Sequence, residues 1–205
     1  MTLRVIAGEY GGRVLKSVRG IGTRPLLGQV REALFNILGP RCEDAVVWDL
    51  FAGTGASGIE ALSRGARAVR FVEKSNQALA VLRENLRLLG PRAEERSVVL
   101  KGDAWLPPAV EDEAAPDLIF LDPPYAKVGE DPASCAYRAT QLAQRLAGGG
   151  ALLFHFPDGL LDADDFDADL QVVLRRWGRS AVAFLAAPNG SSAPDSAPLA
   201  INRRE

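Results

Sequence analysis

Histidine, cysteine and long apolar runs are all scarce in this chain of 205 residues. It has one histidine, and its two cysteines, Cys42 and Cys135, show no metal-ligand spacing. With so few nitrogen and sulfur ligands, we expect no metal site. No apolar run is long enough to cross a bilayer, and the first residues lack the apolar core of a secretory signal. These absences predict a cytoplasmic protein with no membrane partner, and we expect a monomer.

Charge is divided unevenly along the chain. The net charge is −2, but residues 1–41 contain seven basic and two acidic side chains, which leaves −7 for residues 42–205. A basic arm on an acidic body suggests a polyanionic partner such as RNA, although a solvated cluster of surface charges would give the same count. The basic side chains that we expect to contact RNA phosphates are Arg4, Arg13, Lys16, Arg24 and Arg31.

The order of the apolar patterns predicts an α/β fold. Residues 3–18 predict a hairpin, and residues 28–38 a helix. Beyond them, strand patterns at 46–50, 68–73, 97–101, 117–122, 151–156, 170–174 and 181–186 alternate with helix patterns at 57–64, 75–89 and 132–146. Such alternation is typical of a parallel sheet with helices on both faces, whereas the last two strands, joined by a tight turn, must pair antiparallel. We therefore expect a mostly parallel seven-stranded sheet with an antiparallel late strand.

Composition divides the chain into three parts. Residues 1–41 form the basic hairpin-helix extension, and residues 42–187 the catalytic α/β domain. Residues 188–205, rich in Pro, Ser, Ala and Asp, predict a weakly ordered tail.

Four of the predicted strands end in an acidic residue or run directly into one. These acids are Asp49, Glu73, Asp103 and Asp122. In a parallel sheet the carboxyl ends of the strands share one edge, where ligands bind. We therefore expect the four carboxylates to gather around a single crevice.

A glycine turn follows the first strand of the domain. Gly53, Gly55 and Gly58 match the dinucleotide fingerprint, and Glu73, twenty residues after Gly53, is placed to accept hydrogen bonds from ribose hydroxyls. This pattern alone is compatible with nicotinamide, flavin and S-adenosylmethionine cofactors. Asp49, just before the turn, would repel a pyrophosphate and so favours the cationic cofactor S-adenosylmethionine.

The motif Asp122-Pro123-Pro124-Tyr125 follows an apolar strand. The prolines have no N–H to donate, so the motif offers carboxylate and carbonyl acceptors beside an aromatic ring. These groups form a receptor for a planar base that carries an exocyclic amine. The motif therefore predicts methyl transfer to such an amine, with these four residues as the catalytic group.

Residues 46–125 look like a Rossmann-like class I methyltransferase of the amino-methylating type. The wider set of motifs resembles the bacterial 16S ribosomal RNA guanine-N2 methyltransferase family. The motifs are Arg4 to Gly8, Gly11-Gly12-Arg13, Arg24-Pro25, Val30 to Asn36, Phe51 to Gly55, Gly58 to Gly65, Phe71-Val72-Glu73 and Asp122 to Tyr125. The segment Leu26 to Gln29 departs from that family's polar, Thr-rich segment.

This resemblance implies methyl transfer from S-adenosylmethionine to the N2 amine of a guanine. The implied partner is 16S ribosomal RNA or an assembling small ribosomal subunit. It also implies that Asp103 and Ala104 flank the adenine of the cofactor. Taken together, the residues expected to contact the cofactor are Asp49, Phe51, Ala52, Gly53, Thr54, Gly55, Glu73, Asp103 and Ala104.

Three alternatives stay open on the sequence. The same amine receptor would serve adenine-N6 methylation of DNA or RNA. A non-catalytic RNA-binding assembly factor would not need the four acids, and a nicotinamide oxidoreductase would leave residues 122–125 unexplained. Of the remaining candidates, we expect His155 to be structural and Trp48 to pack in the core, while Trp105 is a candidate to cover the adenine.

Overall fold

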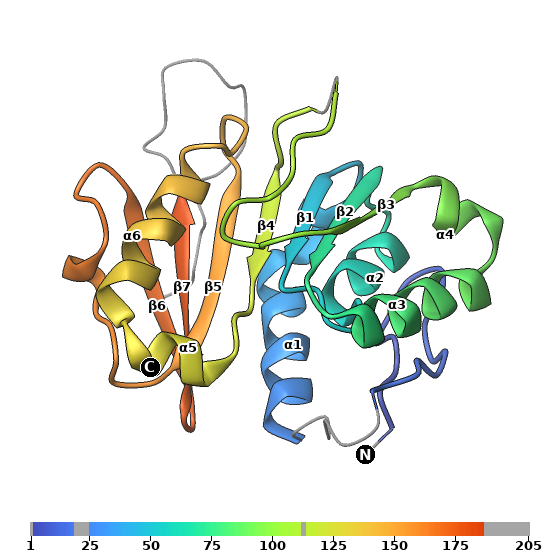
Figure 1. The fold of residues 1–205 in the computed structure, drawn as a ribbon, viewed down its shortest axis with the longest axis horizontal. Helices are drawn as coiled ribbons and strands as arrows, with labels where there is room; N and C mark the ends of the chain where they lie inside the picture. The colour runs from blue at the N-terminus through green and yellow to red at the C-terminus, as the bar shows by residue number, and fades with distance from the viewer. Residues whose placement is uncertain (1, 19–24, 112–113, 187–205) are drawn as a thin grey trace.

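The computed structural model describes residues 2–18, 25–111 and 114–186 (Figure 1). The predicted tail, residues 188–205, and the predicted RNA-binding Arg24 lie outside these ranges. In the described part, seven strands form one sheet in the order β3-β2-β1-β4-β5-β7-β6. Their bounds are β1 Val46–Leu50, β2 Ala68–Glu73, β3 Ser97–Lys101, β4 Leu118–Leu121, β5 Ala151–Pro157, β6 Gln171–Trp177 and β7 Ser180–Ala186.

Strands β1 to β5 pair in parallel, whereas β7 runs antiparallel to both of its neighbours, β5 and β6. The predicted seven-stranded sheet with an antiparallel late strand is therefore confirmed.

The helices are α1 Pro25–Leu38, α2 Ala56–Ser63, α3 Asn76–Leu89, α4 Pro91–Glu95, α5 Tyr125–Glu130 and α6 Pro132–Ala143, with 3₁₀ turns η1 Gly39–Cys42 and η2 Ala163–Asp165. The short helices α4 and α5 were not expected from the sequence. Pro91 was interpreted only as a stop signal for the preceding helix, yet proline is also favoured in the first turn of the next one. Among the described helices, none is long and apolar enough to span a membrane.

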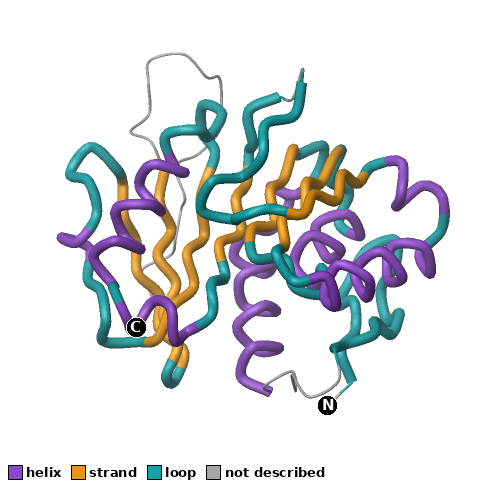
Figure 2. The backbone as a smooth tube through the Cα atoms, in the orientation of Figure 1, coloured by secondary structure: helices purple, strands orange, loops and turns teal. Residues whose placement is uncertain are grey.

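Helices lie on both faces of the sheet (Figures 1 and 2), and the buried apolar side chains form two clusters. Along β1, Val47 belongs to one cluster and Trp48 to the other, and all five residues of the strand are buried. Helices α1 to α4 contribute to the first cluster. Helices α5 and α6, with the connection that follows β3, contribute to the second. Burial on both faces explains the uninterrupted apolar strands, and it confirms that Trp48 lies in the core.

The N-terminal segment folds back as expected, but its strand pairing is limited to one bridge between Arg4 and Val14. A hairpin this small is marginal alone, so its stability must come from packing. The backbone N–H groups of Ile6 and Ala7 donate to the Glu60 carboxylate on α2, at 2.6 and 3.1 Å. The segment also shares the first apolar cluster with the sheet. The domain boundary at residue 41 stays a prediction.

Helix α2 lies so close to β2 that its glycine has no room for a side chain. A Cβ at Gly58 would lie 2.3 Å from a carbon of the Phe71 ring and 2.8 Å from Cγ1 of Val69. Gly58 therefore sets the distance between the helix that follows the glycine turn and the sheet below it.

We predict that Gly58→Ala lowers the free energy of unfolding by about 1–3 kcal/mol, because the added methyl forces Phe71 or the helix to move. Gly28→Ala, on α1, is the matched control: a Cβ there meets nothing within 4 Å, and alanine favours the helix by about 1 kcal/mol. Urea unfolding followed by circular dichroism measures both. Equal stability of the two variants would contradict the packing argument.

Candidate active site

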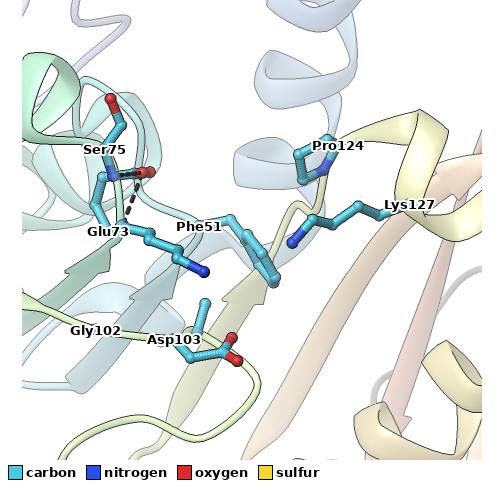
Figure 3. A pocket seen from close by; sticks show the side chains of 9 residues that line it. Phe51, Glu73, Ser75, Gly102, Asp103, Pro124 and Lys127 are labelled. Carbon is cyan, nitrogen blue, oxygen red and sulfur yellow. Dashed lines mark hydrogen bonds between the residues drawn. The ribbon is translucent and has the colours of Figure 1, made fainter.

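The carboxyl ends of the central strands surround a cavity of about 280 Å³ (Figure 3). It is lined by Phe51, Glu73, Lys74, Ser75, Gly102, Asp103, Ala104, Pro124 and Lys127. Residues that belong to or follow β1, β2, β3 and β4 thus meet in one place, although only two of the four strand-end acids, Glu73 and Asp103, line the cavity. Lys74, Ser75, Gly102 and Lys127 are additions that the sequence interpretation did not include. Within the described ranges, no group of three or more His, Cys, Asp and Glu side chains could hold a metal ion.

Glu73 joins the glycine turn to the start of α3. Its Oε2 accepts the N–H of Gly53 at 2.8 Å, and its Oε1 accepts those of Lys74 and Ser75 at 2.8 and 2.7 Å. Gly53 has a φ of 55°, which glycine adopts without strain. A carboxylate offers about four acceptor sites, and three are used here, so Oε2 of Glu73 keeps one site for a ligand hydroxyl. The predicted ribose contact stays a prediction.

The rest of the glycine turn is held by hydrogen bonds to its neighbours. The N–H of Ala52 donates to Val72 on β2 at 3.1 Å, and the carbonyl of Thr54 accepts the side-chain amide of Asn85 at 3.0 Å. The same Asn85 side chain bonds the N–H and the carbonyl of Lys16. The N-terminal segment and the turn are therefore positioned by one buried side chain on α3.

Phe51 has an uncommon backbone conformation for a bulky residue, with a φ of 60°. Its ring projects among the cavity-lining side chains (Figure 3). Trp105 meets this ring edge-on with centroids 5.3 Å apart, and the Lys127 ammonium lies 6.0 Å from the ring centroid. Phe51 thus offers an aromatic surface to a planar ligand. Trp105 packs against Phe51 without lining the cavity, and its predicted contact with adenine stays a prediction.

Asp49 lies beneath the glycine turn rather than on the expected acidic rim, because its side chain is used within the fold. It is 3% exposed, and its Oδ2 accepts the N–H of Gly58 in the first turn of α2 at 2.8 Å. Burial raises the pKa of Asp49 to about 8; the Gly58 N–H opposes this shift, and the nearby carboxylates of Asp122 and Glu73 add to it. The predicted convergence of all four acids on one crevice stays a prediction.

Arg31 differs from the other basic residues of the N-terminal region. Arg4, Arg13 and Lys16 are exposed, whereas Arg31 is half-buried and its Nη2 donates to the carbonyl of Arg4 at 2.7 Å. Burial lowers its pKa, and the carboxylates of Glu60 and Asp49 oppose that change. Its buried Nε has no hydrogen-bond partner in the described structure. Arg31 therefore lies near the acids around the glycine turn, and its predicted RNA contact stays a prediction.

The Asp-Pro-Pro-Tyr motif links β4 to α5. Pro123 is buried, while Pro124 is exposed and lines the cavity. The Pro124 carbonyl accepts the N–H of Lys127 at 2.9 Å, which begins α5. Among the described hydrogen bonds, it is thus the carbonyl of Pro124 rather than that of Pro123 that starts the helix.

Asp122 and Tyr125 are joined by His155, which we had expected to have only a structural role. Asp122 Oδ1 lies 2.8 Å from His155 Nδ1, and the Tyr125 hydroxyl lies 2.8 Å from His155 Nε2 and 2.7 Å from the Ser180 hydroxyl. The Asp122 side chain is 51% exposed, but that of His155 is only 7% exposed. The structure therefore adds His155 and Ser180 to the site.

Residues 3–145 match the model of a protein family described as conserved hypothetical protein 95. The chain belongs to this family. Among its relatives is "Putative rRNA methyltransferase YlbH" of Bacillus subtilis, 42% identical over 125 residues, which are 60% of this chain and 67% of YlbH. Another is ribosomal RNA small subunit methyltransferase D of Haemophilus influenzae, 36% identical over 60% of this chain and 64% of the relative. The matches thus span about two thirds of these relatives or slightly less.

The family's fold also matches known structures. The solved structure named "Putative methyltransferase yhhF from Escherichia coli" superposes with a TM-score of 0.72 at 25% identity, covering 93% of this chain and all of that one. These comparisons confirm the Rossmann-like class I methyltransferase fold and the family resemblance that the motifs indicated.

The raised pKa of Asp49 predicts how stability depends on pH. The folded protein retains a proton on this carboxyl up to about pH 8, whereas an unfolded aspartic acid loses it near pH 4. The free energy of unfolding should therefore fall as pH rises from about 4 to 8, and then level off. Asp49→Asn cannot ionise and keeps an acceptor for Gly58.

The gain in Tm of Asp49→Asn over the parent should grow between pH 5 and pH 9, as measured by thermal unfolding without ligands. Asp103→Asn, at an exposed acid of the same edge, serves as the control and should show no such growth. A constant difference in Tm across this range would show that Asp49 is ionised throughout.

Proposed function

We propose that this protein transfers a methyl group from S-adenosylmethionine to the exocyclic N2 amine of a guanine in 16S ribosomal RNA. The observation that carries the proposal is the position of the Asp122 carboxylate, half-exposed at the same sheet edge as the cavity that contains Glu73. An amine receptor and a nucleoside-sized cavity with a ribose-binding acid thus adjoin each other. The names of the relatives support ribosomal RNA as the substrate.

The residues around the cavity suit S-adenosylmethionine. Glu73 can accept a ribose hydroxyl at its remaining site, and Asp103 and Phe51 can flank the adenine. When bound, this cofactor supplies an electrophilic methyl group on a sulfonium.

Positioning by the chain's own residues is the main source of catalysis in this proposal. The free Oδ2 of Asp122 accepts one N–H of the amine, and the Pro123 carbonyl accepts the other. These two acceptors fix the direction of the nitrogen lone pair. Holding reacting atoms in line lowers a barrier by up to about 7–11 kcal/mol. A strong base is not needed, because the nitrogen becomes acidic once it is methylated and Asp122 can accept the proton.

We predict that Asp122→Ala lowers kcat at least about 100-fold while cofactor affinity stays within a few-fold, since Asp122 lies outside the cofactor cavity. The assay is incorporation of tritiated methyl into small ribosomal subunits, or their free RNA, from cells that lack this modification. Asp164→Ala, at an exposed acid in η2, is the control and should keep full activity.

The product is identified by digesting the RNA and weighing the nucleosides. N2-methylguanosine supports the proposal, and N6-methyladenosine would assign the same receptor to adenine. Equal rates for Asp122→Ala and the parent would remove Asp122 from the mechanism.

The exposed arginines of the N-terminal segment are the proposed RNA contacts. We predict that Arg4→Gln with Arg13→Gln weakens RNA binding and reduces the slope of log Kd against log salt by about 1.5, as expected when two phosphate contacts are lost. Arg138→Gln with Arg179→Gln removes equal charge from exposed sites on α6 and the β6–β7 turn. If both pairs change the slope equally, net charge rather than the N-terminal segment governs binding.

A further inference from the structure

Four polar side chains form a continuous series from the half-exposed Asp122 to the fully buried Ser180. The parallel register of β4 and β5 pairs Leu121 with Phe154, so the next residues, Asp122 and His155, lie side by side. Tyr125, at the start of α5, then connects His155 to Ser180 at the start of β7. All three contacts are between 2.7 and 2.8 Å, which is hydrogen-bonding distance.

With an ionised Asp122 and a neutral His155, the chemistry of the groups sets the direction of each hydrogen bond. An ionised carboxylate only accepts, so His155 must donate to Asp122 through Nδ1–H. In the neutral ring Nε2 then has no proton and accepts from the Tyr125 hydroxyl. The Tyr125 oxygen can in turn accept from the hydroxyl of Ser180. Each donor in the series therefore has one acceptor, and the tautomer of His155 is determined by its neighbours.

We propose that His155 is a positioning residue that holds Asp122 and Tyr125 in the arrangement needed to receive the target base. This inference rests on the proposed amine methylation. Because Nδ1–H binds Oδ1, the second oxygen of Asp122 is the one left to accept from the amine. Because Nε2 binds the Tyr125 hydroxyl, the same imidazole also holds the side chain of Tyr125, whose ring it meets edge-on with centroids 5.3 Å apart.

Because Asp122 is half-exposed, a positioning residue such as His155 is needed to hold its carboxylate. Its half-exposed carboxylate could otherwise rotate and be solvated in several orientations. One bond from a buried imidazole restricts the plane of the carboxylate without covering Oδ2. Misplacement of a reacting group by about 1 Å can cost about 100-fold in rate. A histidine that only fills space in β5 would have no such effect on the reaction rate.

The tautomer can be tested first, and without any substrate. His155 is the only histidine in the chain, so its imidazole signals in ¹⁵N NMR need no assignment. We expect a protonated Nδ1 and an unprotonated Nε2 in the parent protein, and a loss of this preference in Asp122→Ala. An Nε2–H tautomer in the parent would overturn the proposal.

Two variants then separate the contributions of the two ring nitrogens of His155. In His155→Asn the amide NH₂ can reach the place of Nδ1 and still donate to Asp122, whereas in His155→Gln it reaches the place of Nε2 and contacts only Tyr125. We expect kcat to fall about tenfold or less for Asn and about 100-fold for Gln. The KM for S-adenosylmethionine should stay within a few-fold for both. Equal rates for the two variants, or a faster Gln variant, would overturn the positioning role.

The two tests separate this inference from the proposed function. A parent enzyme that shows the Nδ1–H tautomer but methylates adenine instead of guanine refutes the proposed base and keeps His155 as the positioning residue. A parent enzyme that methylates guanine, with variants that match it in kcat, refutes the role of His155 and keeps the proposed function.

Discussion

The parallel register of β1, β2, β3 and β4 is the constraint on which the site depends. Hydrogen bonding between parallel neighbours brings Leu50 level with Val72 and Leu121, so the residues that follow each strand emerge at one edge. The side chains beyond the last paired residues then have to share that space. Burial of β1 on both faces prevents the central strand from shifting, because a slip of one residue would exchange its two apolar faces.

Asp49 lies beneath the glycine turn and stabilises it, although a carboxyl group is costly to bury. Asp49 is enclosed with its pKa raised to about 8, and at neutral pH its protonated form predominates. Its hydrogen bond to Gly58 holds the first turn of α2, while Glu73 holds Gly53 from the other side. A buried acid under the turn thus contributes to the backbone geometry, and the exposed acids around the cavity remain available for ligand contacts.

Much of the fold and the main cavity could be predicted from the sequence, because each strand has a local apolar pattern. Four of the cavity-lining residues, Phe51, Glu73, Asp103 and Ala104, were assigned to the cofactor from motifs. Asp49 was misplaced, because a strand-end position does not reveal which way a carboxylate faces. Arg31 was placed with its exposed neighbours, since charge counts do not distinguish a half-buried guanidinium from a solvated one.

No local sequence motif could have linked His155 to Asp122, although an alignment of β4 with β5 could have indicated the pair. The residue is 33 positions beyond Asp122, and no local pattern joins them. If β4 and β5 are aligned as parallel neighbours, however, the residue after Leu121 lies opposite the residue after Phe154. The cavity thus draws on residues that follow β1 to β4, and the polar series from Asp122 to Ser180 on β4, α5, β5 and β7. In the proposed reaction, methyl transfer would need both parts of the sheet, because the first would hold the methyl donor and the second the amine.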